Sequence, residues 1–176
     1  MKAPICFVAL LVGLTGCSGI FPSPVTPDTG KTADGPRTNF LPIADIEWRR
    51  GDTQAAALTS SGEVRDKGVS IGKLSADGTF VSARSKRSLV MDSTGTVHVA
   101  PGFDVIIDEN GTAVSRVHGQ PDETVTLEQI QKPRDGLPGL IPHNVTPETR
   151  RTAMWILMIP DLLRLLAGVE AGGAAW

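Results

Sequence analysis

Four glycines recur at nearly constant spacing through the middle of the chain. Gly62, Gly78, Gly95 and Gly111 are 16, 17 and 16 residues apart, and each ends a short polar run. The residue four positions before each glycine is apolar, and so is the residue two positions after it. Turn residues at regular intervals, flanked by apolar positions, indicate short β-strands joined by hairpins.

The offset of these apolar positions indicates the type of hairpin. A three-residue loop, in which a type I turn is closed by a glycine in the left-handed region, pairs the residue four before the glycine with the residue two after it. A two-residue loop would shift this pairing and would not place apolar residues opposite one another. Glycine is required because a side chain at positive φ is strained. The predicted cross-strand pairs are Leu58–Val64, Leu74–Phe80, Met91–Val97 and Ile107–Ala113.

Alternation of apolar and polar residues extends this pattern over roughly residues 55–118. Such alternation is typical of strands with one buried face. The chain is therefore predicted to be mainly β, with eight short strands in an antiparallel meander of hairpin repeats, as a small barrel or a β-repeat stack. We favour a single meander that curls on itself or packs against a terminal segment, and a parallel β-solenoid is the second possibility. The hairpin-repeat domain is expected over residues 46–132.

The N-terminus carries a different pattern. Lys2 precedes an apolar run over residues 3–14, which is too short to span a bilayer and fits a signal peptide. The run ends in Leu14-Thr15-Gly16-Cys17. This tetrapeptide resembles the lipobox of bacterial lipoproteins. The resemblance implies that residues 1–16 are a signal peptide, that the Cys17 thiol carries a diacylglycerol, and that a fatty acid such as palmitate acylates the new amino terminus.

The resemblance also implies a location. The residue after Cys17 is Ser18 rather than Asp, which in this family favours the outer membrane over the inner membrane. Two or more acyl chains make a stable anchor, so membrane lipid is one expected partner and the cell envelope is the expected compartment. Residues 17–45 are rich in Pro and Gly, and this composition predicts an extended tether between the lipid and the folded domain.

The C-terminal part is predicted to contain a linker and a helix. Pro and Gly residues indicate a linker over residues 133–146, and Thr146 followed by Pro147 indicates a helix start. The segment 147–176 is strongly apolar, and Pro160 is expected to kink its helix or to begin a second one. Its apolar side chains could cover the β-sheet, contact a partner, lie on a membrane or span it. Asp161 and Arg164 disfavour spanning because charges are costly at the centre of a bilayer.

A protein partner in the envelope is expected to meet this segment. The candidate partner-binding residues are the large apolar side chains on both sides of Pro160, namely Trp155, Ile156, Ile159, Leu162, Leu163 and Leu166.

Neither composition nor motifs indicate catalysis. Acidic and basic residues nearly balance and tyrosine is absent, so nothing favours nucleic-acid binding. His98, His118 and His143 lack the spacing of metal ligands and are predicted to face solvent. Cys6 would leave with the signal peptide and Cys17 would be lipidated, so no free thiol would remain. We therefore predict no enzyme, no cofactor, no metal site and no small-molecule substrate.

Two functions fit this organisation. The first is a non-catalytic envelope lipoprotein whose β-module has a structural or protein-binding role. The second is a phage-encoded lysis protein or virion-associated lipoprotein. A lipobox, a β-rich middle and an apolar C-terminal segment resemble the layout of unimolecular spanins, which link the outer and inner membranes.

Overall fold

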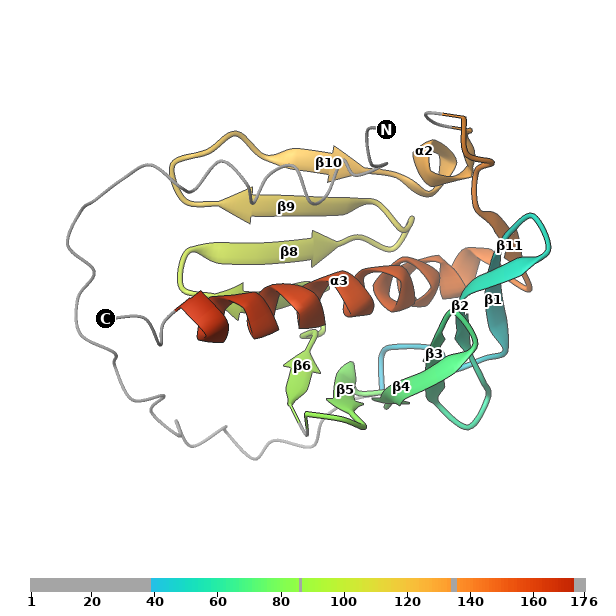
Figure 1. Cartoon of the computed structure of the whole chain (residues 1–176), viewed down its shortest axis with the longest axis horizontal. Helices are drawn as coiled ribbons and strands as arrows, with labels where there is room; N and C mark the ends of the chain where they lie inside the picture. Colours follow the sequence, from blue (N-terminus) through green and yellow to red (C-terminus); the bar gives the residue numbers. More distant parts are fainter. Residues whose placement is uncertain (1–38, 86, 134–135, 173–176) are drawn as a thin grey trace.

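The computed structural model describes residues 39–85, 87–133 and 136–172, and the lipobox and most of the predicted tether lie outside these ranges. The strands form two antiparallel sheets, of seven and four strands (Figure 1). The first sheet contains β1 (Ile46–Arg50), β2 (Thr53–Leu58), β3 (Glu63–Asp66), β4 (Val69–Leu74), β5 (Thr79–Ser82), β6 (Ser88–Val90) and β11 (Ile141–His143). The second contains β7 (Thr96–Ala100), β8 (Phe103–Ile107), β9 (Ala113–Val117) and β10 (Glu123–Val125).

The predicted meander is confirmed. Strands β2 to β9 follow one another in sequence order, and every strand pairing is antiparallel. The first sheet ends at β6 and the second at β7, and these two strands are joined by a single bridge between Met91 and Val97. Within the described ranges the outer strands of the series, β11 and β10, do not pair with each other, so the meander is not a closed barrel, and its antiparallel pairing is not that of a parallel solenoid.

The four glycine turns have the predicted register. The structure pairs Leu58 with Val64, Leu74 with Phe80, Met91 with Val97, and Ile107 with Ala113. All four glycines have positive φ, between 77° and 91°. Successive turns also bond to one another, because the carbonyl oxygen of Gly95 accepts a hydrogen bond of 2.8 Å from the backbone N–H of Ile107, at the start of the next turn.

Side chains that begin the turns add hydrogen bonds that sequence reasoning missed. The Oδ1 atom of Asp92 accepts from the backbone N–H groups of Thr94 and Thr96, each at 2.9 Å. Partial burial raises the pKa of Asp92, but the hydrogen bonds from the Thr94 hydroxyl and from these two backbone groups lower it by more, so the net shift is downward. Asp108 occupies the same place in the next turn and accepts from the backbone N–H of Thr112 at 2.8 Å. The polar run before each glycine is therefore part of the turn itself.

A second series of glycines closes the turns at the opposite ends of the strands. Gly51, Gly68, Gly102 and Gly119 all have positive φ. They are 17, 34 and 17 residues apart, and the place midway between Gly68 and Gly102 is taken by Ser85, in a longer loop. The repeating unit is thus a pair of strands with a glycine at each of its two turns.

The C-terminal helix α3 (Arg150–Gly172) is the centre of the hydrophobic core. It follows the one-turn 3₁₀ helix η1 (Pro147–Thr149) and lies between the second sheet and the green strands of the first (Figure 1). Residues 152–156 are buried on every side of the helix, as expected of a helix inside a core. The indole Nε1 of Trp48 on β1 donates a 3.1 Å hydrogen bond to the carbonyl oxygen of Ala153. The helix therefore packs against the inner faces of the meander.

Of the two outcomes predicted for Pro160, the start of a second helix is wrong, because α3 is one helix that continues through this residue. Proline removes the hydrogen bond to the carbonyl of Ile156. Ile156, Ile159 and Leu162 are nevertheless buried before and after this position. Their packing favours one continuous helix over two separate ones.

Part of the predicted linker over residues 133–146 is a strand. Strand β11 pairs with β1 at the edge of the first sheet, where Pro142 lies opposite Trp48. An edge strand tolerates proline because one of its two sides has no neighbour to bond. The short helix α2 (Leu127–Gln131) follows β10 and begins with a capping box between Thr126 and Gln129.

Candidate functional site

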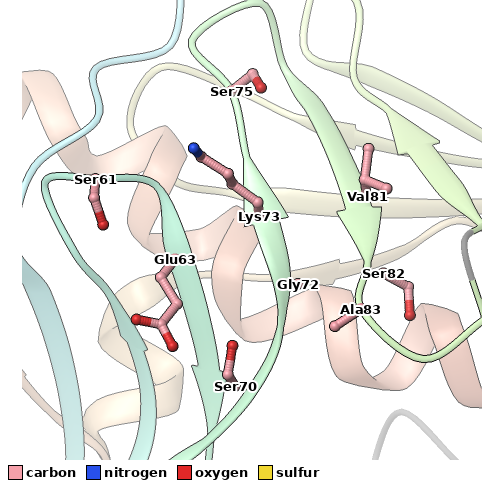
Figure 2. A pocket seen from close by; sticks show the side chains of 9 residues that line it. All are labelled: Ser61, Glu63, Ser70, Gly72, Lys73, Ser75, Val81, Ser82 and Ala83. Atoms are coloured by element: carbon pink, nitrogen blue, oxygen red, sulfur yellow. The ribbon is translucent and has the colours of Figure 1, made fainter.

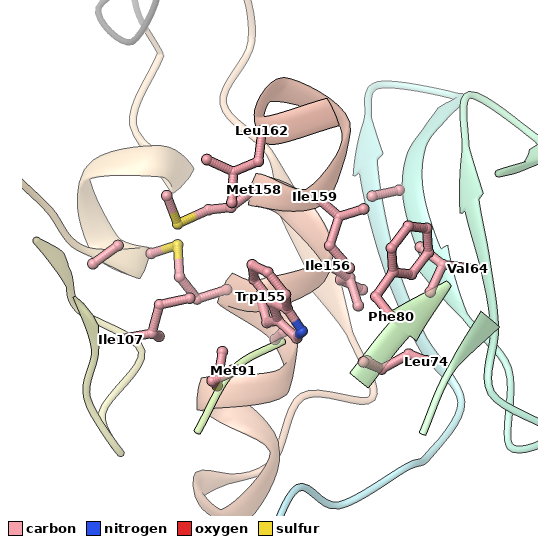
Figure 3. Packing of buried hydrophobic residues seen from close by; sticks show 14 of the residues in the cluster. Val64, Leu74, Phe80, Met91, Ile107, Trp155, Ile156, Met158, Ile159 and Leu162 are labelled. Carbon is pink, nitrogen blue, oxygen red and sulfur yellow. The ribbon is translucent and has the colours of Figure 1, made fainter. Parts of the chain in front are cut away.

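Most of the predicted partner-binding residues lie in the protein's own core. Trp155, Ile156, Ile159 and Leu162 are at most 1% exposed, and Leu163 and Leu166 are half-buried against the same cluster. In Figure 3, Ile156 and Ile159 lie toward Phe80 of the first sheet, with Ile107 of the second sheet on the other side of the helix. The four buried side chains are not available to a partner, which corrects the expectation that they form a contact surface.

The shape of the meander explains why these side chains of α3 are buried. Its strands bury one face, so the inner side chains Val64, Leu74, Phe80, Met91 and Ile107 need an apolar cover. A single curved sheet cannot supply that cover without closing into a barrel. Helix α3 supplies it, as the only long apolar segment among the described residues.

The remaining sequence candidates have structural roles or lie outside the described residues. Gly62, Gly78, Gly95 and Gly111 form turns and present no side chain to a ligand. Cys17 lies outside the described ranges.

The three histidines are exposed, as predicted. His98 stands on the outer face of the second sheet, where its Nδ1 lies 2.7 Å from Oδ1 of Asp104. Asp104 is also opposite Arg116, whose guanidinium bonds Asp122 at 3.1 and 3.3 Å. The hydrogen bond to Asp122 raises the pKa of Arg116. This row of alternating charges makes the outer face of the second sheet a solvated surface.

The described residues contain neither a metal-binding cluster nor a membrane-spanning helix. No group of three or more His, Cys, Asp or Glu side chains in these ranges is arranged to hold a metal ion. In the same part of the chain, every helix is too short or too polar to cross a bilayer.

A surface hollow of about 610 Å³ lies on the outer side of β3, β4 and β5 (Figure 2). Lys73 is opposite Glu63 on one side and Val81 on the other. A hydrogen bond from Arg65 lowers the pKa of Glu63. Val81 and Val90 are each 46% exposed, and their register places both on this outer face. The lining combines serine hydroxyls with the charged side chains of Glu63 and Lys73.

A second hollow, of about 420 Å³, lies where η1 and α3 begin. Its lining joins the start of the described chain, the fourth glycine turn and the first helical residues, and consists of Phe40, Pro42, Glu109, Asn110, Pro147, Glu148 and Arg151. Sequence reasoning does not single out Arg151, because its neighbour Arg150 has the same chemistry and only the fold distinguishes them.

Comparison of the chain with protein-family models, with curated proteins and with solved structures gave no match.

Proposed function

We propose that this chain is a lipid-anchored protein of the bacterial envelope, at the outer rather than the inner membrane. Its folded part would be a non-catalytic β-module that braces or binds another protein. The observation that carries the proposal is the tetrapeptide Leu14-Thr15-Gly16-Cys17 at the end of a short apolar run.

The way the chain enters the module is compatible with a tether. The backbone N–H groups of Phe40 and Leu41 donate to the carbonyl oxygen of Ala76 at 3.1 and 3.0 Å. Leu41 is buried in the core, so the chain is anchored in the folded module from this residue onward. The residues between Cys17 and Asn39 could span about 70 Å if fully extended, which is more than enough to hold the module away from a lipid surface.

The position of α3 favours this function over the spanin-like alternative. A bridging protein would need its C-terminal segment in a second membrane. Withdrawing α3 from the module would remove Trp155, Ile156 and Ile159 from the core and leave the inner faces of both sheets uncovered. A partner protein would instead meet surfaces that α3 does not need, such as the outer face of β3 to β5.

The lipid anchor gives a direct prediction. In a bacterial host fed with labelled palmitate, the full chain is expected to incorporate label, and Cys17→Ser is expected to abolish it because the acceptor thiol is lost. Cys6→Ser is the matched control and should keep the label, since Cys6 lies in the segment that is removed. Mass spectrometry of the mature amino terminus checks the site. A chain that retains Met1, or an unmodified Cys17, would contradict the proposal.

A further inference from the structure

Arg151 is an unusual arginine in this structure. Its side chain is only 14% exposed, and its single ionic contact within the described ranges is a 3.9 Å approach of Nη2 to Oε1 of Glu109. Its Nε atom is buried and has no hydrogen-bond partner among the described residues. A buried donor without an acceptor is costly, and buried charges are normally paired.

Other arginines of the chain are more exposed and better paired. Arg116, whose side chain is 56% exposed, bonds Asp122 at 3.1 Å. Arg164, at 60% exposure, bonds Asp66 at 3.2 Å. Glu109, in contrast, is 90% exposed and can turn away from Arg151 at little cost. The most buried of these guanidinium groups is thus the one that lacks an anionic partner at hydrogen-bond distance.

The buried Nε atom lies against the Gly95 turn, whereas the hollow offers room for an anionic partner at Nη2, the guanidinium atom that approaches Glu109. Arg151 lies next to the Gly95 turn and lines the hollow of about 420 Å³. Phe40, Pro42 and Pro147 supply apolar walls. Guanidinium groups bind carboxylates by paired, charge-assisted hydrogen bonds, so a carboxylate is the chemical group that Arg151 suits best.

Two carboxylates in the hollow favour a ligand that also carries a positive charge. Glu109 and Glu148 line the same hollow. Hydrogen bonds from Thr146 and from its own backbone lower the pKa of Glu148. A ligand with only a negative charge would be repelled by these two groups, whereas an ammonium group would be attracted to them.

We propose that this hollow binds a small zwitterion, an amino acid or short peptide, with its carboxylate on Arg151 and its ammonium group toward Glu109 and Glu148. The apolar walls would contact the ligand's side chain. This site is separate from the proposed lipid anchor and does not depend on it.

The test uses ¹⁵N-labelled protein comprising residues 17–176 with Cys17→Ser, which retains every described residue. The probe is the dipeptide Ala-Ala, and the Nε–H resonance of Arg151 is followed by NMR. We expect this resonance to shift and saturate as Ala-Ala is added. Ala-Ala amide lacks the carboxylate and N-acetyl-Ala-Ala lacks the ammonium group, and each is expected to bind at least about tenfold more weakly.

Variants locate the effect. Arg151→Gln is expected to weaken Ala-Ala binding at least about tenfold, as followed by the backbone resonance of Asn110. Arg150→Gln is the matched control and should bind as the parent does, because Arg150 is exposed and does not line the hollow. Thermal unfolding of both variants separates loss of binding from loss of fold, and the three dipeptides on the parent protein test the proposal without any variant.

Three outcomes would overturn the proposal. The first is no saturable shift with Ala-Ala. The second is equal binding of Ala-Ala and its amide, which would show that the carboxylate is not recognised. The third is equal affinity of Arg151→Gln and the parent protein for Ala-Ala, which would show that Arg151 is not the group that binds.

Discussion

Replacing Gly95 with alanine is expected to destabilise the module by about 3 kcal/mol or more, whereas the same replacement at Gly119 is expected to cost about 1 kcal/mol. Both glycines have positive φ, of 91° and 81°, so both substitutions strain the backbone. They differ in what a Cβ atom would meet. At Gly95 it would overlap the carbonyl oxygen of Ile107, and at Gly119 nothing lies within 4 Å.

Urea unfolding followed by tryptophan fluorescence measures this difference. The backbone strain is common to the two variants, so the excess cost at Gly95 reports the close approach of one turn to the next hairpin. Overpacking of this kind cannot be relieved by a rotamer change, since the obstructing atom belongs to the backbone. Equal losses of stability at Gly95 and Gly119 would contradict the stacked arrangement of the turns.

Replacing Trp155 with alanine is expected to cost about 3–5 kcal/mol, which is close to the whole stability of many small domains. Trp155 is fully buried in the core, so its removal would leave a large cavity between α3 and the sheets. Trp155→Phe is expected to be far milder because the ring is retained. The indole Nε1 has no hydrogen-bond partner among the described residues, so its loss leaves no acceptor unsatisfied.

Leu163→Ala is the matched control for Trp155→Ala on the same helix. Leu163 is half-buried against the core, and its truncation is expected to cost about 1 kcal/mol. Urea unfolding followed by circular dichroism suits all three variants, because the signal does not depend on the tryptophan itself. A Trp155→Ala variant as stable as Leu163→Ala would mean that α3 is not central to the core.

The turns could be predicted from sequence because their chemistry is local. A glycine at positive φ, an apolar residue on either side and a fixed offset determine the register within about six residues. The second glycine series has a weaker signature in the sequence. Its members follow different residues, as in Arg50-Gly51 and Pro101-Gly102, and Ser85 interrupts the period.

The location of α3 and the edge strand β11 could not be read from local patterns. An apolar helix is compatible with a core, a partner surface or a membrane surface, and only the curvature of the meander shows that its inner face needs an apolar cover. Strand β11 pairs Ile141 with Arg49, which is far away in the chain. The proline in this strand is more typical of a linker, so the local sequence does not indicate a strand. Arg151 is likewise distinguished from Arg150 only by its tertiary surroundings.

Hydrogen exchange on residues 17–176 with Cys17→Ser, without membranes or partners, tests most directly whether α3 is an internal part of the module. The amides of residues 153–159 are expected to be as protected as those of β3 and β8 and to exchange only on global unfolding, because helix and strands share one core. Exchange of these helical amides within minutes while the strands remain protected would contradict this, as would protection that appears only when lipid vesicles are added.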